Sequence, residues 1–487
     1  MSQRPGKQQD RAVKSPAEPE HDASELPEGW GKCRVGEVFK ISSGGTPSRT
    51  ESRYWNGNVP WLSSGDIKTD EIEVGTEFIT EAGLQNSTAK LCEPGAVVVV
   101  VRSGVLKHTL PVAVLRRPAA INQDLKCFDS GSKDLNRWLA LELKASTHLI
   151  LSENREGTTV QSVKSETLRE FELPLPPLAE QRRIVAKLEE LLGKVSSSQQ
   201  RLSRVPGLLK RFRQSVLAAA CSGRLTPDWR EENVQDNEYI STSLDEVADY
   251  VGGFAFRSPE FLRTGKHQVI RIGNVRPMQL DILAAPIFIP EEIAADTERF
   301  CLQPNDIVVS MTGTKYKRDY GHAAMIEGHH GSLFINQHVS RVRCGKTLLP
   351  RFLLYWMHSD LFRNHFFAGE TGNVNQGNVG ADGIRKAPIE LPPLAEQQEI
   401  VRRVEKLFAF ADQIEARLTQ AQTHVDRITQ SLLAKAFRGE LVPTEHALAA
   451  AAGREYESAT KLLGRVLASA NLESHGSRKK KVTSKGT

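Results

Sequence analysis

Two loops of the sequence combine glycine with basic and hydroxyl side chains, directly after an apolar run. They are VRSGVLKHT (101–109) and MTGTKYKRDYG (311–321). Glycine permits close backbone approach, bases and hydroxyls contact phosphates, and arginine also pairs with the edge of guanine. We therefore expect both loops to contact nucleic acid. The candidate residues are Arg102, Ser103, Lys107 and His108 in the first loop, and Thr312, Lys315, Lys317 and Arg318 in the second.

Two more glycine-rich loops lie near the start of each globular segment, SSGGTPSR (42–49) and GGFAFRS (252–258). They add Ser43, Thr46, Arg49 and Arg257 to the candidate residues. One basic loop alone is more often a solvated turn. The same kind of loop at matching places in both halves favours a shared kind of ligand.

The elements that position these loops also occur twice. LCEPGAVVVVVRSG (91–104) and CLQPNDIVVSMTG (301–313) each predict a turn that leads into a buried strand. The triplet INQ then recurs at 121–123 and 335–337. Between these marks the two sequences diverge. We expect one mixed α/β fold that has been adapted to two ligands.

The repeat is strongest in two segments at a fixed offset, which both open with LPPLAEQ, at Leu175 and Leu391. Without a gap, 22 of the 53 pairs between 175–227 and 391–443 are identical. This period is too long for a solenoid and indicates duplication of a module. Each segment is predicted to begin as a helix after two prolines, with a glutamate in its first turn, and to stop at Gly223 or Gly439.

Apolar residues recur in alternating steps of four and three along both segments, which predicts a coiled-coil seam. The matching phase favours two helices packed antiparallel on each other over two unrelated amphipathic helices, each on its own domain. From Ile400 to Leu432 such a helix spans ~48 Å, more than one turn of DNA. Pro206 predicts a kink in the first helix. The seam residues are Ile184, Leu188, Leu191, Val195, Leu202, Val205, Leu209, Ile400, Val404, Leu407, Ile414, Leu418, Val425 and Ile428.

Composition narrows the class of protein. The net charge of +5 equals the five bases of the tail SRKKKVTSKGT (477–487), so charge alone does not indicate nucleic-acid binding. The six cysteines lack a C-x-x-C spacing, which indicates a reducing, cytoplasmic location. No apolar run approaches the ~20 residues of a membrane span. Residues 1–25 are polar and aperiodic and are predicted to be a disordered leader.

Signatures of catalysis are missing from the sequence. RCGKT (343–347) has Ser340 where a phosphate-binding loop needs glycine, and it follows a strand pattern. We find no S-adenosylmethionine loop, no methylation motif and no residues at metal-ligand spacing. We expect a protein that binds no cofactor or metal itself.

The chain resembles the specificity subunits of type I restriction–modification systems, nearest to the enteric type IA branch. The resemblance covers 25–445 and is carried by the two LPPLAEQ starts, LKRFRQSVLAAACSGRLTPDWR (209–230), ITQSLLAKAFRGEL (428–441) and LPEGW (26–30). It implies an α+β protein in which two mixed α/β target recognition domains are joined by two long helices that form an antiparallel coiled coil, with a pseudo-two-fold internal repeat. The implied divisions are a leader (1–25), recognition domains (26–174 and 228–390), helical regions (175–227 and 391–443), and a C-terminal helical segment with a basic tail (444–487).

The resemblance also implies a non-catalytic role. Each recognition domain would read half of a bipartite, asymmetric sequence of double-stranded DNA. The coiled coil would set the gap and dock two methyltransferase subunits that use S-adenosylmethionine. Two restriction subunits would add ATP- and Mg²⁺-dependent translocation and cleavage. The alternatives are a self-contained DNA methyltransferase or nuclease with a coiled-coil arm, and a coiled-coil adaptor that does not bind DNA.

Overall fold

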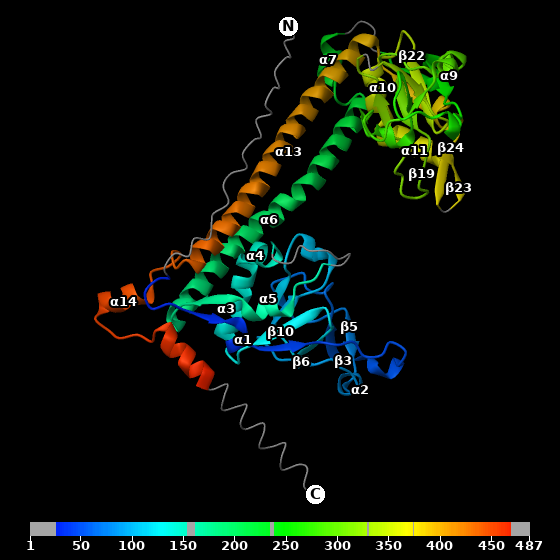
Figure 1. The fold of residues 1–487 in the computed structure, drawn as a ribbon. Coiled ribbons are helices and arrows are strands. Elements are labelled where there is room, and N and C mark those ends of the chain that lie inside the picture. The colour runs from blue at the N-terminus through cyan, green and yellow to red at the C-terminus, as the bar shows by residue number, and fades with distance from the viewer. Residues whose placement is uncertain (1–25, 153–160, 234–237, 329–330, 374, 469–487) are drawn as a thin grey trace, which may run out of the picture. The chain divides into compact units, whose positions relative to one another are not determined.

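A computed structural model describes residues 26–152, 161–233, 238–328, 331–373 and 375–468. The predicted leader (1–25) and the basic tail lie outside these residues. The chain divides into two compact units (Figure 1). Unit 1 consists of two segments of the chain, one up to Gln199 and one from Thr423 onward. Unit 2 is the segment between them, Gln200–Gln422.

The body of unit 1 is built on two sheets, with strand orders β2-β10-β7-β8-β4 and β5-β3-β9-β6, and a separate pair β1-β11. Its strands are β1 Gly31–Arg34, β2 Lys40–Ser43, β3 Trp55–Leu62, β4 Glu71–Ile72, β5 Glu77–Ile79, β6 Leu91–Cys92, β7 Val97–Val100, β8 Val112–Leu115, β9 Ala119–Ile121, β10 Leu125–Asp129 and β11 Glu172–Leu175. Its short helices are α1 Val35–Val38, η1 Ser52–Tyr54, α2 Glu81–Gln85, η2 Gly104–Lys107, α3 Lys133–Ala145, α4 Thr147–Ser152, α5 Ser165–Glu170 and α14 Glu445–Ala452, and residues 459–468 are also helical.

The body of unit 2 repeats this plan, with strand orders β13-β22-β18-β20 and β17-β14-β21 and a separate pair β12-β25, and adds the sheet β19-β24-β23 and the pair β15-β16. Its strands are β12 Ile240–Ser243, β13 Ala248–Gly252, β14 His267–Ile270, β15 Val275–Arg276, β16 Gln279–Leu280, β17 Phe288–Ile289, β18 Ile307–Ser310, β19 Thr312–Gly313, β20 Ala323–Met325, β21 Ser332–Ile335, β22 Val339–Cys344, β23 Glu370–Asn373, β24 Gln376–Val379 and β25 Pro388–Leu391. Its short helices are α7 Pro227–Glu232, α8 Leu244–Val247, η3 Ser258–Glu260, η4 Ile272–Asn274, α9 Glu291–Asp296, η5 Glu298–Phe300, α10 Pro350–Met357, α11 Asp360–Ala368 and α12 Asp382–Arg385.

The predicted buried strands are confirmed. Every residue of β7 and of β18 is buried, because both are short β-branched runs at the centre of their sheets. In both units the strand that ends at the isoleucine of the INQ triplet pairs in parallel with an earlier strand. These pairs are β9 with β3 in unit 1 and β21 with β14 in unit 2. The two diverged sequences therefore form the same frame.

The two repeated segments form α6 Leu178–Cys221 and α13 Leu394–Phe437, each of 44 residues. Both end just before the predicted stops, Gly223 and Gly439, which have φ of 70° and 73° in the left-handed region that favours glycine. Pro206 lies inside α6, which continues through it.

The helices run antiparallel and lie side by side in each unit (Figure 1). In unit 1, Gln199 Nε2 donates to Asp426 Oδ1 at 3.4 Å, and in unit 2, Arg213 Nη2 donates to Asp412 Oδ1 at 2.6 Å. The predicted coiled coil is confirmed. Its seam is buried at Ile184, Leu188, Leu209, Ile400, Val404 and Leu418, half-buried at Leu191, Val195, Leu202, Val205, Leu407, Ile414 and Val425, and 36% exposed at Ile428.

The ends of the seam also enter the cores of the two bodies. Ile184 and Leu188, from the start of α6, pack in the core of unit 1 with Leu433 from the end of α13. Ile400 and Val404, from the start of α13, pack in the core of unit 2 with residues from the end of α6. In each unit, the start of one helix and the end of the other thus join the coiled coil to the body.

The glutamate of the first LPPLAEQ is fully buried, which the sequence does not reveal. Glu180 Oε1 accepts a hydrogen bond from Trp30 Nε1 at 2.9 Å, and Oε2 accepts one from the Glu445 backbone N–H at 2.7 Å. Burial raises the pKa of Glu180 against the lowering effect of these hydrogen bonds. This carboxylate holds the chain that follows α13.

The glutamate of the second LPPLAEQ does the same in unit 2. Glu396 is fully buried and accepts from Thr226 Oγ1 at 2.7 Å, from Tyr239 Oη at 2.8 Å and from Arg230. All three donors come from the chain that follows α6. The repeated motif therefore anchors, in each unit, the segment that leaves the other helix.

Candidate nucleic-acid interface

Each INQ triplet and the residue after it form a turn, here called the INQ turn (121–124 and 335–338). In unit 1 this turn holds loops 42–49 and 101–109 together. The Gly45 N–H donates to the Ile121 carbonyl at 2.9 Å, and the Val101 N–H donates to the Asp124 carbonyl at 2.8 Å. One turn is thus bonded on one side to the loop 42–49 and on the other to the loop 101–109. The sequence had placed these loops in one domain, and the structure brings them to one site.

The same arrangement recurs in unit 2. The Phe254 N–H donates to the Ile335 carbonyl at 3.0 Å, and the Met311 N–H donates to the His338 carbonyl at 2.9 Å. The loop 252–258 and the loop 311–321 are therefore joined by the second INQ turn. All these bonds are between backbone atoms, so the frame does not depend on which side chains the loops carry.

One glycine of each Gly-Gly pair is required by the close approach of the INQ turn. A Cβ on Gly44 would lie 2.0 Å from the Ile121 carbonyl oxygen, and a Cβ on Gly253 would lie 2.0 Å from the Asn336 carbonyl oxygen. No side chain fits at such distances. The glycines are thus explained by the backbone contact and not by a direct role with a ligand.

Several candidate side chains of loop 42–49 are already engaged within unit 1. Thr46 Oγ1 donates to Gln123 Oε1 at 2.6 Å, and Lys126 Nζ donates to Ser43 Oγ at 2.6 Å. Ser43 is exposed and Thr46 is half-buried. These contacts add Gln123, which belongs to the repeated INQ triplet, and Lys126 to the polar surface of the site. Neither is among the residues predicted from the sequence to contact nucleic acid.

Arg49 is held by a carboxylate and an aromatic ring. Its two terminal nitrogens donate to both oxygens of Glu77, at 2.5 and 2.8 Å, and its guanidinium lies 3.8 Å from the centre of the Trp55 ring. The hydrogen bond to Glu77 raises the pKa of Arg49 and, in return, lowers that of Glu77. Its side chain is still 55% exposed, so the guanidinium face is presented in a fixed orientation.

The basic side chains of loop 101–109 point to solvent. Arg102 is 63% exposed and 3.9 Å from Asp124, and Lys107 and His108 are exposed as well. Ser103 caps the start of η2, and its Oγ accepts from the Val105 N–H at 3.4 Å. The loop is therefore a short, capped turn that exposes three nitrogen-bearing side chains.

In unit 2 the candidates divide into internal and exposed residues. Thr312 lies in β19 and is only 8% exposed, and Lys315 Nζ donates to the Gly372 carbonyl at 2.8 Å. Lys317, Arg318 and Arg257 are exposed. Arg318 has φ of 51°, which is rare for a residue other than glycine and places strain in this loop.

Sequence reasoning missed the antiparallel ribbon of β23 and β24, which pairs with β19 directly beside loop 311–321. The sequence signal is two short polar stretches that contain glycine, ETGN (370–373) and QGNV (376–379). Neither stretch has the apolar alternation by which strands are recognised, so the pattern does not predict a ribbon.

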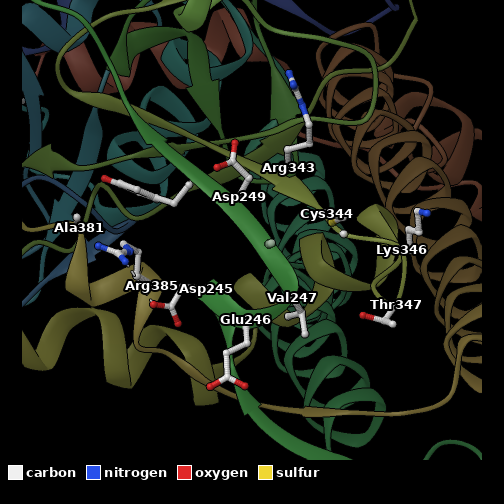
Figure 2. Close-up of a pocket in the computed structure, with 13 residues that line it drawn as sticks. Asp245, Glu246, Val247, Asp249, Arg343, Cys344, Lys346, Thr347, Ala381 and Arg385 are labelled. Carbon is white, nitrogen blue, oxygen red and sulfur yellow. Dashed lines mark hydrogen bonds and ion pairs between the residues drawn. The ribbon is translucent and has the colours of Figure 1, made fainter.

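A polar cavity of about 620 Å³ in unit 2 lies around the RCGKT stretch (Figure 2). Its arginines are paired internally: Arg343 donates to both oxygens of Asp306 at 2.6 and 2.7 Å, and Arg385 lies 3.5 Å from Asp245. Arg343 lies in β22, which ends at Cys344, and the next helix starts only at Pro350. The stretch is therefore no phosphate-binding loop, as predicted.

Within the described ranges, no three His, Cys, Asp or Glu side chains lie close enough to hold a metal ion. None of the helices in these ranges is both long and apolar enough to cross a membrane.

Comparison with known proteins defines the class. The family model of the type I restriction modification DNA specificity domain matches residues 27–206 and 237–422. The chain therefore belongs to this family, carries two such domains, and is a DNA-recognition subunit of a type I restriction–modification system and not a catalytic one.

Its relatives agree with the resemblance to the enteric branch. The chain is 28% identical over 428 residues to the type I restriction enzyme EcoKI specificity subunit of Escherichia coli K12, across 86% of this chain and 90% of that one. It is 31% identical over 342 residues to the EcoBI specificity subunit of Escherichia coli, across 66% and 70%. A chain from a solved structure on complex assembly of the type I R-M system has the same fold, with a TM-score of 0.62 at 20% identity over 86% of this chain and all of that one.

Proposed function

We propose that each unit reads one half of a bipartite, asymmetric sequence in double-stranded DNA. The observation that carries this proposal is the double occurrence of one backbone frame with different side chains at the same place. In unit 1 the INQ turn joins loops with a clamped Arg49 and an exposed Arg102; in unit 2 it joins loops with exposed Arg257 and Arg318. Equal frames with unequal side chains suit two half-sites of different sequence.

The recognition domains are proposed to be 26–174 and 228–390, with helical regions 175–227 and 391–443 between and after them. In support, β1 pairs with β11 and β12 pairs with β25, so the first and last strands of each body close on each other. The helices begin immediately after these closing strands.

The coiled coil is proposed to set the gap between the half-sites. Both helices are continuous for 44 residues, ~66 Å at ~1.5 Å per residue. They are also anchored at both ends by buried Glu180 and Glu396. A length of helix fixed in this way supports a fixed separation.

The partners are proposed to be two modification subunits, which use S-adenosylmethionine, and two restriction subunits, which use ATP and Mg²⁺. Docking on the helices is supported by large apolar side chains that face solvent there: Phe410 is 57% exposed and Leu208 is 53% exposed. Adenine in a duplex is reached by base flipping, which we assign to the modification subunits. Since the target is cellular DNA, we propose a cytoplasmic location.

The decisive experiment maps methylation in cells that express the chain with its modification subunit. We expect one bipartite motif. The double variant Arg102→Ala, Lys107→Ala should weaken recognition through one half-site, and Lys317→Ala, Arg318→Ala through the other. A motif without a gap, or both variants acting on the same half, would refute the proposal.

A second measurement separates the alternatives. The purified chain, given duplex DNA, S-adenosylmethionine, ATP and Mg²⁺ but no partner, should neither methylate nor cleave. Activity of the chain alone would favour the self-contained enzyme, and absence of a mobility shift with target DNA in the assembled complex would favour the adaptor.

A further inference from the structure

The ribbon β23–β24 in unit 2 has two chemically different sides. Its strands pair Glu370 with Val379, Thr371 with Asn378, Gly372 with Gly377, and Asn373 with Gln376. Paired residues share a face and neighbours alternate. One face therefore carries Thr371, Asn373, Gln376 and Asn378, all exposed, and the other carries Glu370, Gly372, Gly377 and Val379.

The second face is fastened to the body of unit 2. Tyr320 Oη donates to Glu370 Oε1 at 2.6 Å, and Lys315 Nζ donates to the Gly372 carbonyl at 2.8 Å. A Cβ on Gly377 would lie 2.7 Å from Tyr320 Oη, so the strand is pressed against this ring. The orientation of the ribbon is thus fixed by internal contacts, and Lys315 serves here as a positioning residue.

The first face is free of charge. It carries three amides and the Thr371 hydroxyl, which donates to the Asn378 carbonyl at 3.1 Å, and Figure 1 shows the ribbon extending from the other strands of its unit. A ribbon edge that only has to stay solvated is commonly protected by lysine, glutamate or proline, and this face has none of them. An amide offers a donor and an acceptor together, which is the pattern that adenine N7 and N6 require.

The surroundings fit a duplex. The major groove of DNA admits a two-stranded ribbon. Lys317 and Arg318 are exposed in the loop that precedes the fastened Tyr320, where they can contact the phosphates on either side of a groove. The neutral amides of the ribbon are suited to nucleobases, and the basic side chains beside it are suited to the phosphates of the DNA backbone.

We infer that this ribbon enters the major groove of the half-site bound by unit 2, and that amides among Asn373, Gln376 and Asn378 read the adenine of an A·T pair. The inference rests on the proposed function, because it assigns a reader within one of the two half-sites. It makes these residues specificity-determining, without a part in methyl transfer.

The test uses the full chain in complex with its modification subunits and the target found by methylation mapping. Competition binding at one fixed salt concentration compares the target with duplexes in which single A·T pairs of the unit 2 half-site are replaced, or their adenines exchanged for 7-deazaadenine, which lacks the N7 acceptor. The wild-type complex should lose about 5- to 150-fold in affinity at the replaced A·T pair. Gln376→Ala or Asn378→Ala should bind both duplexes alike.

Controls separate reading from folding. Gln303→Ala changes an exposed amide that precedes β18, whereas β19 and the ribbon follow that strand, and it should keep the wild-type preference. Gln376→Asn keeps an amide at the same position and should retain part of the preference, so the test stays decisive even where Gln376→Ala folds poorly.

The outcomes are distinct. Ribbon variants that keep every A·T preference, or that weaken all duplexes equally, would overturn the ribbon assignment and leave the bipartite proposal standing. A preference lost in the unit 1 half-site would overturn it too. A wild-type complex without a bipartite site would overturn the proposed function and the ribbon with it.

Discussion

Shortening the coiled coil by one heptad in both helices should shorten the gap in the DNA site. The residue numbers of the paired side chains add to the same value, 625, in Gln199–Asp426 and in Arg213–Asp412. By this register 201–207 of α6 faces 418–424 of α13. Removing both segments takes one matched layer from the middle and leaves the anchors at both ends.

The expected change follows from helix geometry. Seven residues at ~1.5 Å each are ~10.5 Å of helix, which is about three base pairs at ~3.4 Å per pair. This is an upper bound, because the helices need not run parallel to the DNA axis. Seven residues turn a helix by almost two full turns, with a residual of ~20°, while three base pairs turn DNA by ~100°. We therefore expect a gap shortened by up to three base pairs and weaker binding, with unchanged bases in each half-site.

Methylation mapping in cells that express the variant with its modification subunit measures gap and bases in one experiment. The matched control is Pro206→Ala, Gly207→Ala, which alters the same heptad at constant length and should keep the gap. An unchanged gap in the deletion variant, or new bases in a half-site, would refute the idea that helix length sets the spacing.

Three further predictions concern stability and can be read by hydrogen–deuterium exchange, which reports on each unit separately. Gly44→Ala should destabilise unit 1 and Gly253→Ala unit 2, by about 1–3 kcal/mol each, since their Cβ atoms would lie 2.0 Å from backbone oxygens; Gly104→Ala, with no atom within 4 Å, should be neutral. Glu396→Ala should cost unit 2 about 3–5 kcal/mol, because it leaves buried donors without their acceptor. Burial lowers the pKa of His358 from 6.5 to about 4, so protonation favours the unfolded state. The free energy of unfolding of unit 2 should therefore fall by roughly 3 kcal/mol as the pH drops from 6.5 towards 4. His358→Gln should remove this part of the pH dependence.

The helices could be predicted from the sequence because their signals are local. These signals are the 3.5-residue seam, the prolines before Leu178 and Leu394, and the glycines that follow the last residue of each helix. Each of them acts within a turn or two of helix. The partners of the buried glutamates could not be predicted. Glu180 meets the Glu445 backbone 265 residues away, and a first-turn glutamate looks like an ordinary response to the helix dipole.

The loops of the candidate site could be located from the sequence, but not their contacts. Repetition of INQ marked a shared frame, and the structure shows that its backbone joins two loops in each unit. Glu77, which clamps Arg49, and Lys126, which contacts Ser43, lie 28 and 83 residues from these partners. Side-chain pairs at such separations depend on strand register, which a single sequence without apolar alternation does not determine.

The way the frame is bonded explains how one fold can present two different sets of side chains. The contacts that bring the loops together are made by backbone atoms of the INQ turn, where a Cβ on Gly44 or Gly253 would lie 2.0 Å from a carbonyl oxygen. Exposed side chains of these loops, such as Arg257 and Lys317, take no part in these backbone contacts and can change without loss of the frame. The two units differ at these positions, since Arg49 is clamped by Glu77 while Arg257 is exposed. Among the described residues, only unit 2 has a two-stranded ribbon that pairs with β19 at the start of its basic loop 311–321. Specificity can therefore diverge by side chain alone, while the backbone frame that holds the loops is kept.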